Sequence, residues 1–117
     1  MAKYEVPVPN RVRVAASPAT VSWGGKADEE LLEKEFHGMY GGNRAGGRRI
    51  ILDSHQNDSQ FSGTFLHELL EYISAIHTGQ RISHRTIVTF AVGLHQVFEG
   101  MGLRFVKGDT TAKEAKQ

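Results

Sequence analysis

The sequence contains no cysteine among its 117 residues. This absence excludes thiolate zinc sites, disulfide bonds and thiol nucleophiles, and it says nothing about the redox state of the compartment. No apolar run approaches the roughly 20 residues that span a bilayer, and residues 1–5 lack the apolar core of a signal peptide. We therefore expect a cytoplasmic protein with no membrane partner.

The chain also lacks an excess of charge of either sign. Its formal net charge is +1 at pH 7, so the composition gives no reason to expect nucleic acid or a membrane surface as a specific partner. A content of 39% hydrophobic and 23% charged residues is typical of one globular domain. We expect this domain to cover residues 1–106, ending in a short strand or packed tail at residues 103–106. A disordered polar tail is predicted over residues 107–117.

The first half of the chain is predicted to form a small sheet. Residues 11–15 and 20–23 alternate polar and apolar side chains, as strands with one buried face do. The Ser17–Pro18 pair between them predicts a hairpin turn. A short helix is expected over residues 28–36, and a further strand over residues 49–53.

Residues 38–49 are dense in glycine and arginine. Such a stretch can cradle phosphate, but this one lacks the Gly-Lys-Ser/Thr ending of a P-loop and the spacing of a dinucleotide fingerprint. We therefore interpret it as a hairpin loop that leads into the following strand.

Two longer amphipathic helices are predicted in the second half. The first begins after an N-cap at Asp58 or Ser59 and runs to about Thr78, where a glycine follows. The second begins after the N-cap candidate Ser83 and runs to about residue 100. Because the link between them is short, the helices should pack antiparallel.

The first of these helices carries the pattern His-Glu-x-x-Glu at residues 67–71. Residues four apart lie on nearly the same face of a helix, so His67 and Glu71 can reach one metal ion together. Glu68 points roughly 100° away around the axis. This is the geometry of the His-Glu-x-x-His zinc motif, in which the intervening glutamate is the general base. Here the second ligand is a glutamate, which is also an oxygen donor for zinc.

A catalytic zinc site needs a third protein ligand, and the second helix offers two histidines. His84 lies near its start, and His95 lies three turns later on the same edge. Simple antiparallel packing puts His95 level with His67, and His84 closer to the level of Ser74 or His77. The pattern therefore leaves both histidines open as the third ligand.

Other readings of the polar residues are weaker. His55 lies in a predicted loop without a spaced partner, and His77 falls on the apolar arc of its helix, where a core histidine is the more common case. No serine lies in a nucleophile-elbow context, and no spacing indicates a pair of carboxylates for glycoside hydrolysis. A structural domain in which His67 and Glu71 are solvated surface residues is also compatible with the pattern.

Residues 64–73 resemble the motif helix of the small phage and prophage zincin-like proteins, which are minimal metallopeptidase-type domains distantly similar to the ImmA/IrrE group. The family pattern there is Thr-Leu-Leu-His-Glu-x-x-His/Glu-Ala-Ile. Residues 82–87 are similar to the Leu-x-His-x-x-Ile that accompanies the Glu form of the motif. Residues 93–98 resemble the Gly-Leu-Tyr-Gln-Val-Leu ending of the second helix. With looser matches nearer the N-terminus, the resemblance covers about residues 6–105.

The resemblance implies an α+β fold, in which a small antiparallel sheet packs on the motif helix beside a second, antiparallel C-terminal helix. Carried over by position, it makes His67, Glu71 and His84 the ligands of a Zn²⁺ ion. It makes Glu68 the base that activates water for attack on a peptide bond. His95 stands where the family usually has an aromatic residue, which favours His84 as the third ligand.

The implied function is that of a zinc-dependent metallopeptidase in the cytoplasm of a bacterial host cell, acting on a peptide or protein. The alternative is a non-catalytic metal-binding or protein-interaction module that retains the fold. Two departures from the family support the alternative. Glu71 replaces the second motif histidine, and Val88 and Ala91 occupy positions where relatives place an acidic residue.

Overall fold

The computed structural model describes residues 3–42 and 47–108, which form both helices and strands, with the two long helices following one another near the end of the described chain. The predicted fold class is thereby confirmed. In chain order the elements are β1 (Tyr4–Pro7), β2 (Arg11–Val14), β3 (Ser17–Trp23), α1 (Gly25–Lys34), β4 (Gly38–Gly42), β5 (Arg48–Leu52), α2 (Asp58–Thr78), α3 (His84–Gly100) and β6 (Leu103–Val106).

The larger sheet has four strands in the order β2-β3-β5-β4, and a two-stranded sheet joins β1 to β6. The predicted hairpin of β2 and β3 is antiparallel, as is the pair of β4 and β5. The prediction of a wholly antiparallel sheet is wrong, because β3 and β5 run parallel and so do β1 and β6. Parallel neighbours need a crossover connection, and the segment that contains α1 and β4 supplies one between β3 and β5.

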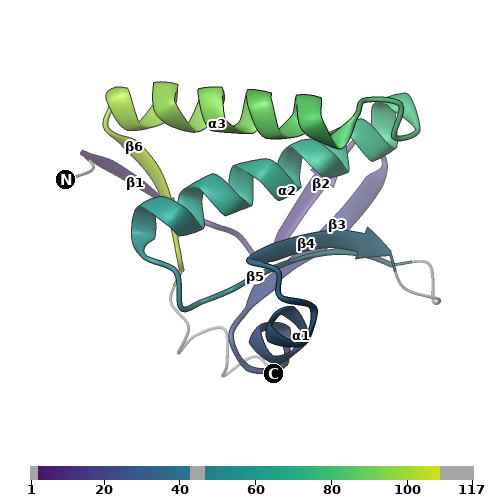
Figure 1. Cartoon of the computed structure of the whole chain (residues 1–117), viewed down its shortest axis with the longest axis horizontal. Coiled ribbons are helices and arrows are strands. Elements are labelled where there is room, and N and C mark those ends of the chain that lie inside the picture. Colours follow the sequence, from purple (N-terminus) through teal and green to yellow (C-terminus); the bar gives the residue numbers. More distant parts are fainter. Residues whose placement is uncertain (1–2, 43–46, 109–117) are drawn as a thin grey trace.

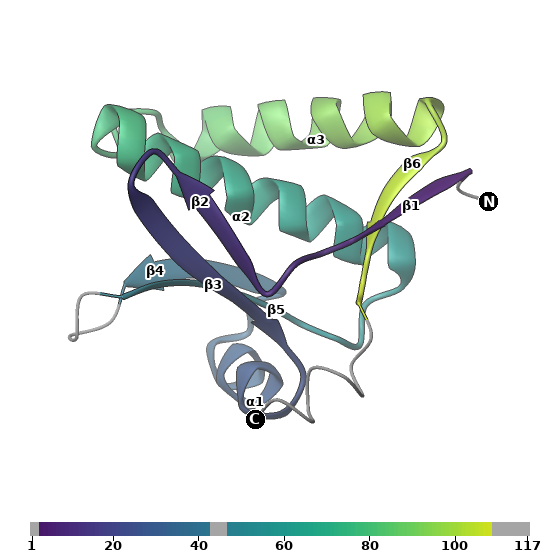
Figure 2. The same ribbon diagram turned by 180° about the vertical axis from the view of Figure 1, so that it is seen from behind.

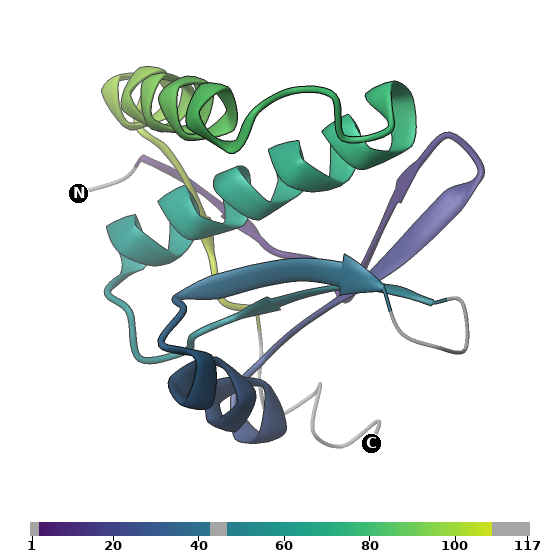
Figure 3. The same ribbon diagram turned by 45° about the vertical axis from the view of Figure 1, so that its right-hand side comes forward.

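The elements form layers around the four-stranded sheet. Helix α2 lies on one face and α1 on the opposite face, while α3 packs on the side of α2 away from the sheet (Figures 1 and 3). Strand β5 serves both faces, because Ile50 and Leu52 join the core beneath α2 and Ile51 joins a smaller core beneath α1. The core under α2 consists of Val8, Ala19, Val21, Trp23, Ile50, Leu52, Phe61, Phe65 and Tyr72.

Tyr72 fixes the β2–β3 hairpin to α2, and Figure 2 shows this hairpin against the helix from behind. The fully buried phenol accepts a hydrogen bond of 2.9 Å from the backbone N–H of Val14 and donates one to the carbonyl of Ser17. Because both partners belong to the hairpin, a single side chain sets the position of these strands relative to the helix that carries the His-Glu-x-x-Glu pattern.

The ends of α2 and α3 are set by their capping residues. Asn57 is the N-cap of α2, where its side chain and that of Gln60 form a reciprocal capping box. The predicted N-cap at Asp58 or Ser59 is therefore wrong by one or two positions. Ser83 caps α3 as predicted, accepting a hydrogen bond from Thr86. Gly79 adopts the left-handed conformation that ends α2, with φ of 63°.

The glycine-rich stretch that sequence analysis interprets as a loop instead begins with a strand. β4 covers Gly38–Gly42 and lies at the edge of the larger sheet, next to α2. Close approach explains its first glycine, because a β-carbon on Gly38 would lie only 2.5 Å from Cγ2 of Thr64. Residues 43–46, the centre of the predicted loop, lie outside the described residues.

The C-terminal end of the described chain contacts the body of the protein. Lys107, which sequence analysis assigns to the polar tail, donates through Nζ to the backbone carbonyl of Ser54 at 2.7 Å and lies over the Phe61 ring. The rest of the predicted tail, residues 109–117, lies outside the described residues. No helix in the described ranges is long and apolar enough to cross a membrane.

Candidate metal centre

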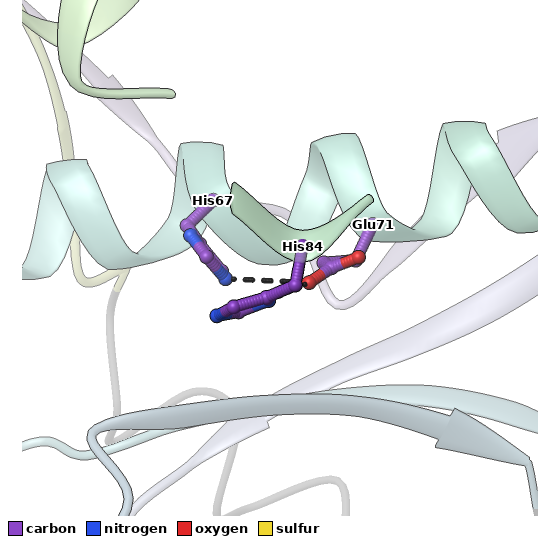
Figure 4. Close-up of side chains that lie close together, drawn as sticks. All are labelled: His67, Glu71 and His84. Atoms are coloured by element: carbon purple, nitrogen blue, oxygen red, sulfur yellow. Dashed lines mark hydrogen bonds and ion pairs between the residues drawn. The ribbon is translucent and has the colours of Figure 1, made fainter. Parts of the chain in front are cut away.

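His67, Glu71 and His84 meet at the point where the start of α3 passes α2. Each offers one donor atom, and these three atoms all lie within 4.8 Å of one another. Nε2 of His67 is 3.5 Å from Oε2 of Glu71, and Nδ1 of His84 is 2.8 Å from the same oxygen. Figure 4 shows the three side chains turned toward one another.

The donor set and its spacing fit a zinc ion. Two imidazole nitrogens and one carboxylate oxygen are usual zinc ligands, and donors about 2.1 Å from a tetrahedral ion lie roughly 3.4 Å apart. The separation of His67 and Glu71 already matches this value. Nδ1 of His84 lies closer to the Glu71 oxygen than two ligands of one zinc ion would, because the two side chains are joined by a direct hydrogen bond of 2.8 Å. Its exposed side chain has room to move outward by the small amount required.

Glu68 lies beside these residues but is held by the sheet. Its side chain is buried, with an exposed fraction of 8% for the residue, and its carboxylate is 3.9 Å from Nε2 of His67. The backbone N–H of Tyr40 in β4 donates to this carboxylate. Because Gly38 has no side chain, β4 can approach closely enough to make that contact. The approach of β4 to Glu68 is not predicted from the sequence, because three of the five residues of β4 are glycine and such a composition indicates a loop.

The surroundings of the site shift the pKa values of Glu68 and His67. Burial raises the pKa of Glu68 to about 7, and the negative charge of Glu71 acts in the same direction. The hydrogen bond from Tyr40 and the nearby His84 oppose this shift. Burial lowers the pKa of His67, although Glu71 partly offsets the effect. A neutral imidazole is the form that binds a metal ion.

His95 lies away from the three donors. Its ring packs over Gly63, and its Nε2 is 3.5 Å from Oγ of Ser59 and 3.7 Å from a carboxylate oxygen of Glu99. Since Gly63 precedes His67 by one turn of α2, the expectation that His95 is level with His67 is wrong by about a turn. His84 lies correspondingly nearer the motif, and it is the histidine of α3 that joins the cluster.

A second group of donors lies on the other side of β5. Asp28, Asp53 and His55 place one donor atom each within 4.8 Å of one another, a grouping that sequence reasoning missed because Asp28 is distant in the chain. The Asp28 carboxylate is already occupied, since it accepts hydrogen bonds from the backbone and hydroxyl of Ser54 and from the N–H of Gly24. We interpret this group as a structural contact that joins α1 to the loop after β5 through hydrogen bonds.

His77 does not lie in the core. Its side chain is exposed near the end of α2, so the interpretation of His77 as a core histidine is wrong. Ile76, one position earlier, is the residue of this turn that packs against the core.

The candidate metal centre opens into a cleft of about 850 Å³. Helix α2 forms its floor, with β4 on one side and α3 on the other. His67, Glu68, Glu71 and His84 all line this cleft, and His95 lines it farther along α2. The volume is within the range of ordinary ligand sites.

No protein-family model, curated protein or solved structure is measurably similar to this chain. What the site can do must therefore be judged from the geometry of its own residues.

Proposed function

We propose that the protein is a zinc-dependent metallopeptidase that acts on a peptide or protein in the cytoplasm of a bacterial host cell. The observation that carries the proposal is the convergence of His67, Glu71 and His84 in one cleft, with the carboxylate of Glu68 beside them. Three protein ligands with a further position left free are typical of catalytic zinc, whereas structural zinc sites usually have four.

His67, Glu71 and His84 would hold the ion, and Glu68 would move the proton. When bound, zinc polarises a carbonyl oxygen and lowers the pKa of a water ligand toward about 7. Glu68 is suited to accept a proton near neutral pH, because burial raises its pKa to about 7. The backbone N–H of Tyr40 donates to this carboxylate and favours its charged form, which limits the rise in the pKa.

The second candidate is a metal-binding or protein-interaction module without catalysis. Its metal-free form, a protein-interaction module, is favoured by the hydrogen bond of 2.8 Å between His84 and Glu71, because this bond gives both side chains a partner without an ion. The departures at Glu71, Val88 and Ala91 favour it as well. The two candidates differ in whether Glu68 has a role in turnover.

The test compares zinc-loaded wild type with Glu68→Gln on an unfolded protein substrate, followed by mass spectrometry of the fragments. We expect the substitution to lower hydrolysis by at least about a hundredfold, because it removes the base, while zinc content stays unchanged. Glu33→Gln is the matched control, since Glu33 is exposed outside the cleft. Equal hydrolysis by Glu68→Gln would exclude the proposed base. Full zinc loading without any hydrolysis would favour the second candidate.

A further inference from the structure

The cleft extends beyond the metal residues toward the N-terminal end of α2. Gln56 marks this end, because its side chain donates to the carbonyl of His37 and accepts a hydrogen bond from Thr64. The turn between α1 and β4, which contains Phe36, therefore borders the cleft one turn of α2 before His67. His95 lies at the same end, over Gly63.

Two apolar side chains border this part of the cleft from different elements. Phe36 lies in the turn before β4, and Val92 lies on α3, one turn before His95. Their exposed fractions are 52% and 51%. Large apolar side chains that line a cleft without being covered are typical of binding sites, since a ligand that covers them removes apolar surface from water.

Gly63 of α2 lines the same part of the cleft and lies directly against the ring of His95. A β-carbon on Gly63 would lie 3.2 Å from Nδ1 of the His95 ring, which is closer than ordinary contact. A larger residue there would require the ring to shift by a few tenths of an ångström. Glycine is unfavourable in the middle of a helix, so its presence indicates that close packing of the ring matters at this position.

The charges of the cleft restrict what it can hold. Its acidic lining residues are Glu35, Glu68 and Glu71, and no lysine or arginine lines it within residues 3–42 and 47–108. A segment with acidic side chains would meet carboxylates and no permanent cation from the protein. An uncharged apolar side chain would instead cover Phe36 and Val92 without losing hydration of a charge.

We propose that this end of the cleft binds a large apolar side chain of an extended polypeptide segment, held between Phe36 and Val92 beside the metal residues. The inference rests on the proposed function, because it places the segment where the zinc and Glu68 would act. It defines the substrate class as segments with a large apolar residue next to the bond that is cut.

The experiment measures binding rather than turnover, using zinc-loaded protein with Glu68→Gln to prevent cleavage. Three pools of fluorescent ten-residue peptides have randomised flanks and a central Phe, Ser or Glu, and their affinities are measured by anisotropy. We expect the Phe pool to bind at least tenfold more tightly than the Ser and Glu pools. Phe36→Ser and Val92→Ser should each lower the affinity of the Phe pool at least fivefold.

Two matched controls come from the part of α3 outside the cleft. Phe90 and Val97 have exposed fractions of 65% and 57% and do not line the cleft, so Phe90→Ser and Val97→Ser should leave the affinity of the Phe pool unchanged. Equal binding of all pools, preference for the Glu pool, no binding at all, or equal losses in the controls would each overturn the inference.

Zinc content of the same samples separates this inference from the proposed function. Zinc bound without discrimination among the pools overturns the inference and leaves the metal centre intact. A preference for the Phe pool without any bound zinc overturns the metallopeptidase proposal and supports an apolar binding cleft.

Discussion

Replacing His67 by alanine should reduce the zinc affinity of the protein by at least about a hundredfold. Loss of a group that only supports a ligand already costs about ten- to a hundredfold, and His67 would be a direct ligand. Its side chain is partly buried, and its Nε2 lies 3.5 Å from the carboxylate of Glu71, the next ligand on the same helix. Competitive titration with a chromophoric chelator measures the affinity.

The histidines of α3 provide the controls for this prediction. His84→Ala should weaken zinc binding, because Nδ1 of His84 is part of the donor cluster. His95→Ala should leave the affinity unchanged, since its ring lies over Gly63. Retained stoichiometric zinc in His67→Ala would contradict the assignment of the site. The opposite order of the two α3 variants would transfer the third position to His95.

In the metal-free protein, Glu68→Gln should increase the free energy of unfolding at pH 8 by up to about 3 kcal/mol. The pKa of Glu68 is raised from 4.5 to about 7 in the folded state, so the folded protein binds more protons than the unfolded chain between these values. Stability should therefore fall as the pH rises from about 4.5 to about 7 and then level off. The glutamine, which carries no charge, removes that loss.

Denaturant unfolding of the unsubstituted protein and of Glu68→Gln at pH 4 and pH 8 measures the difference in their free energies of unfolding. At pH 4 the carboxyl is mostly protonated in both states, so the advantage of the glutamine over Glu68 should be small. Glu33→Gln should show no comparable dependence on pH, because Glu33 is exposed. An equal effect of Glu68→Gln at both pH values would show that Glu68 is not desolvated in the folded protein.

The helices that carry the candidate site could be predicted well because their signals are local. Periodic apolar residues and the capping serine indicate the limits of α3, and the glycine after Thr78 marks the end of α2. The grouping of His67 and Glu71 follows from spacing on one helix. Whether His84 or His95 joins these two residues depends on how far α3 is shifted along the axis of α2. That shift is set by the packing between the helices, so the sequence of either helix alone does not predict it.

Strand β4 shows why the sheet was harder to predict. Three of its five residues are glycine, and glycine has low strand propensity, so the local pattern indicates a loop. The reason for Gly38 is the proximity of Thr64 in another element, and such a contact has no local signal. The burial of Glu68 depends on the same approach of β4, and the parallel pairing of β3 with β5 likewise depends on a crossover.

The most direct test of the metal centre is a crystal structure of the zinc-loaded protein with diffraction data recorded on both sides of the zinc absorption edge. We predict one anomalous peak per chain, within about 2.2 Å of donor atoms from His67, Glu71 and His84. No peak in crystals supplied with zinc would contradict the account. A single peak at Asp28, Asp53 and His55 would contradict it equally, because it would place the ion on the opposite side of the sheet from Glu68.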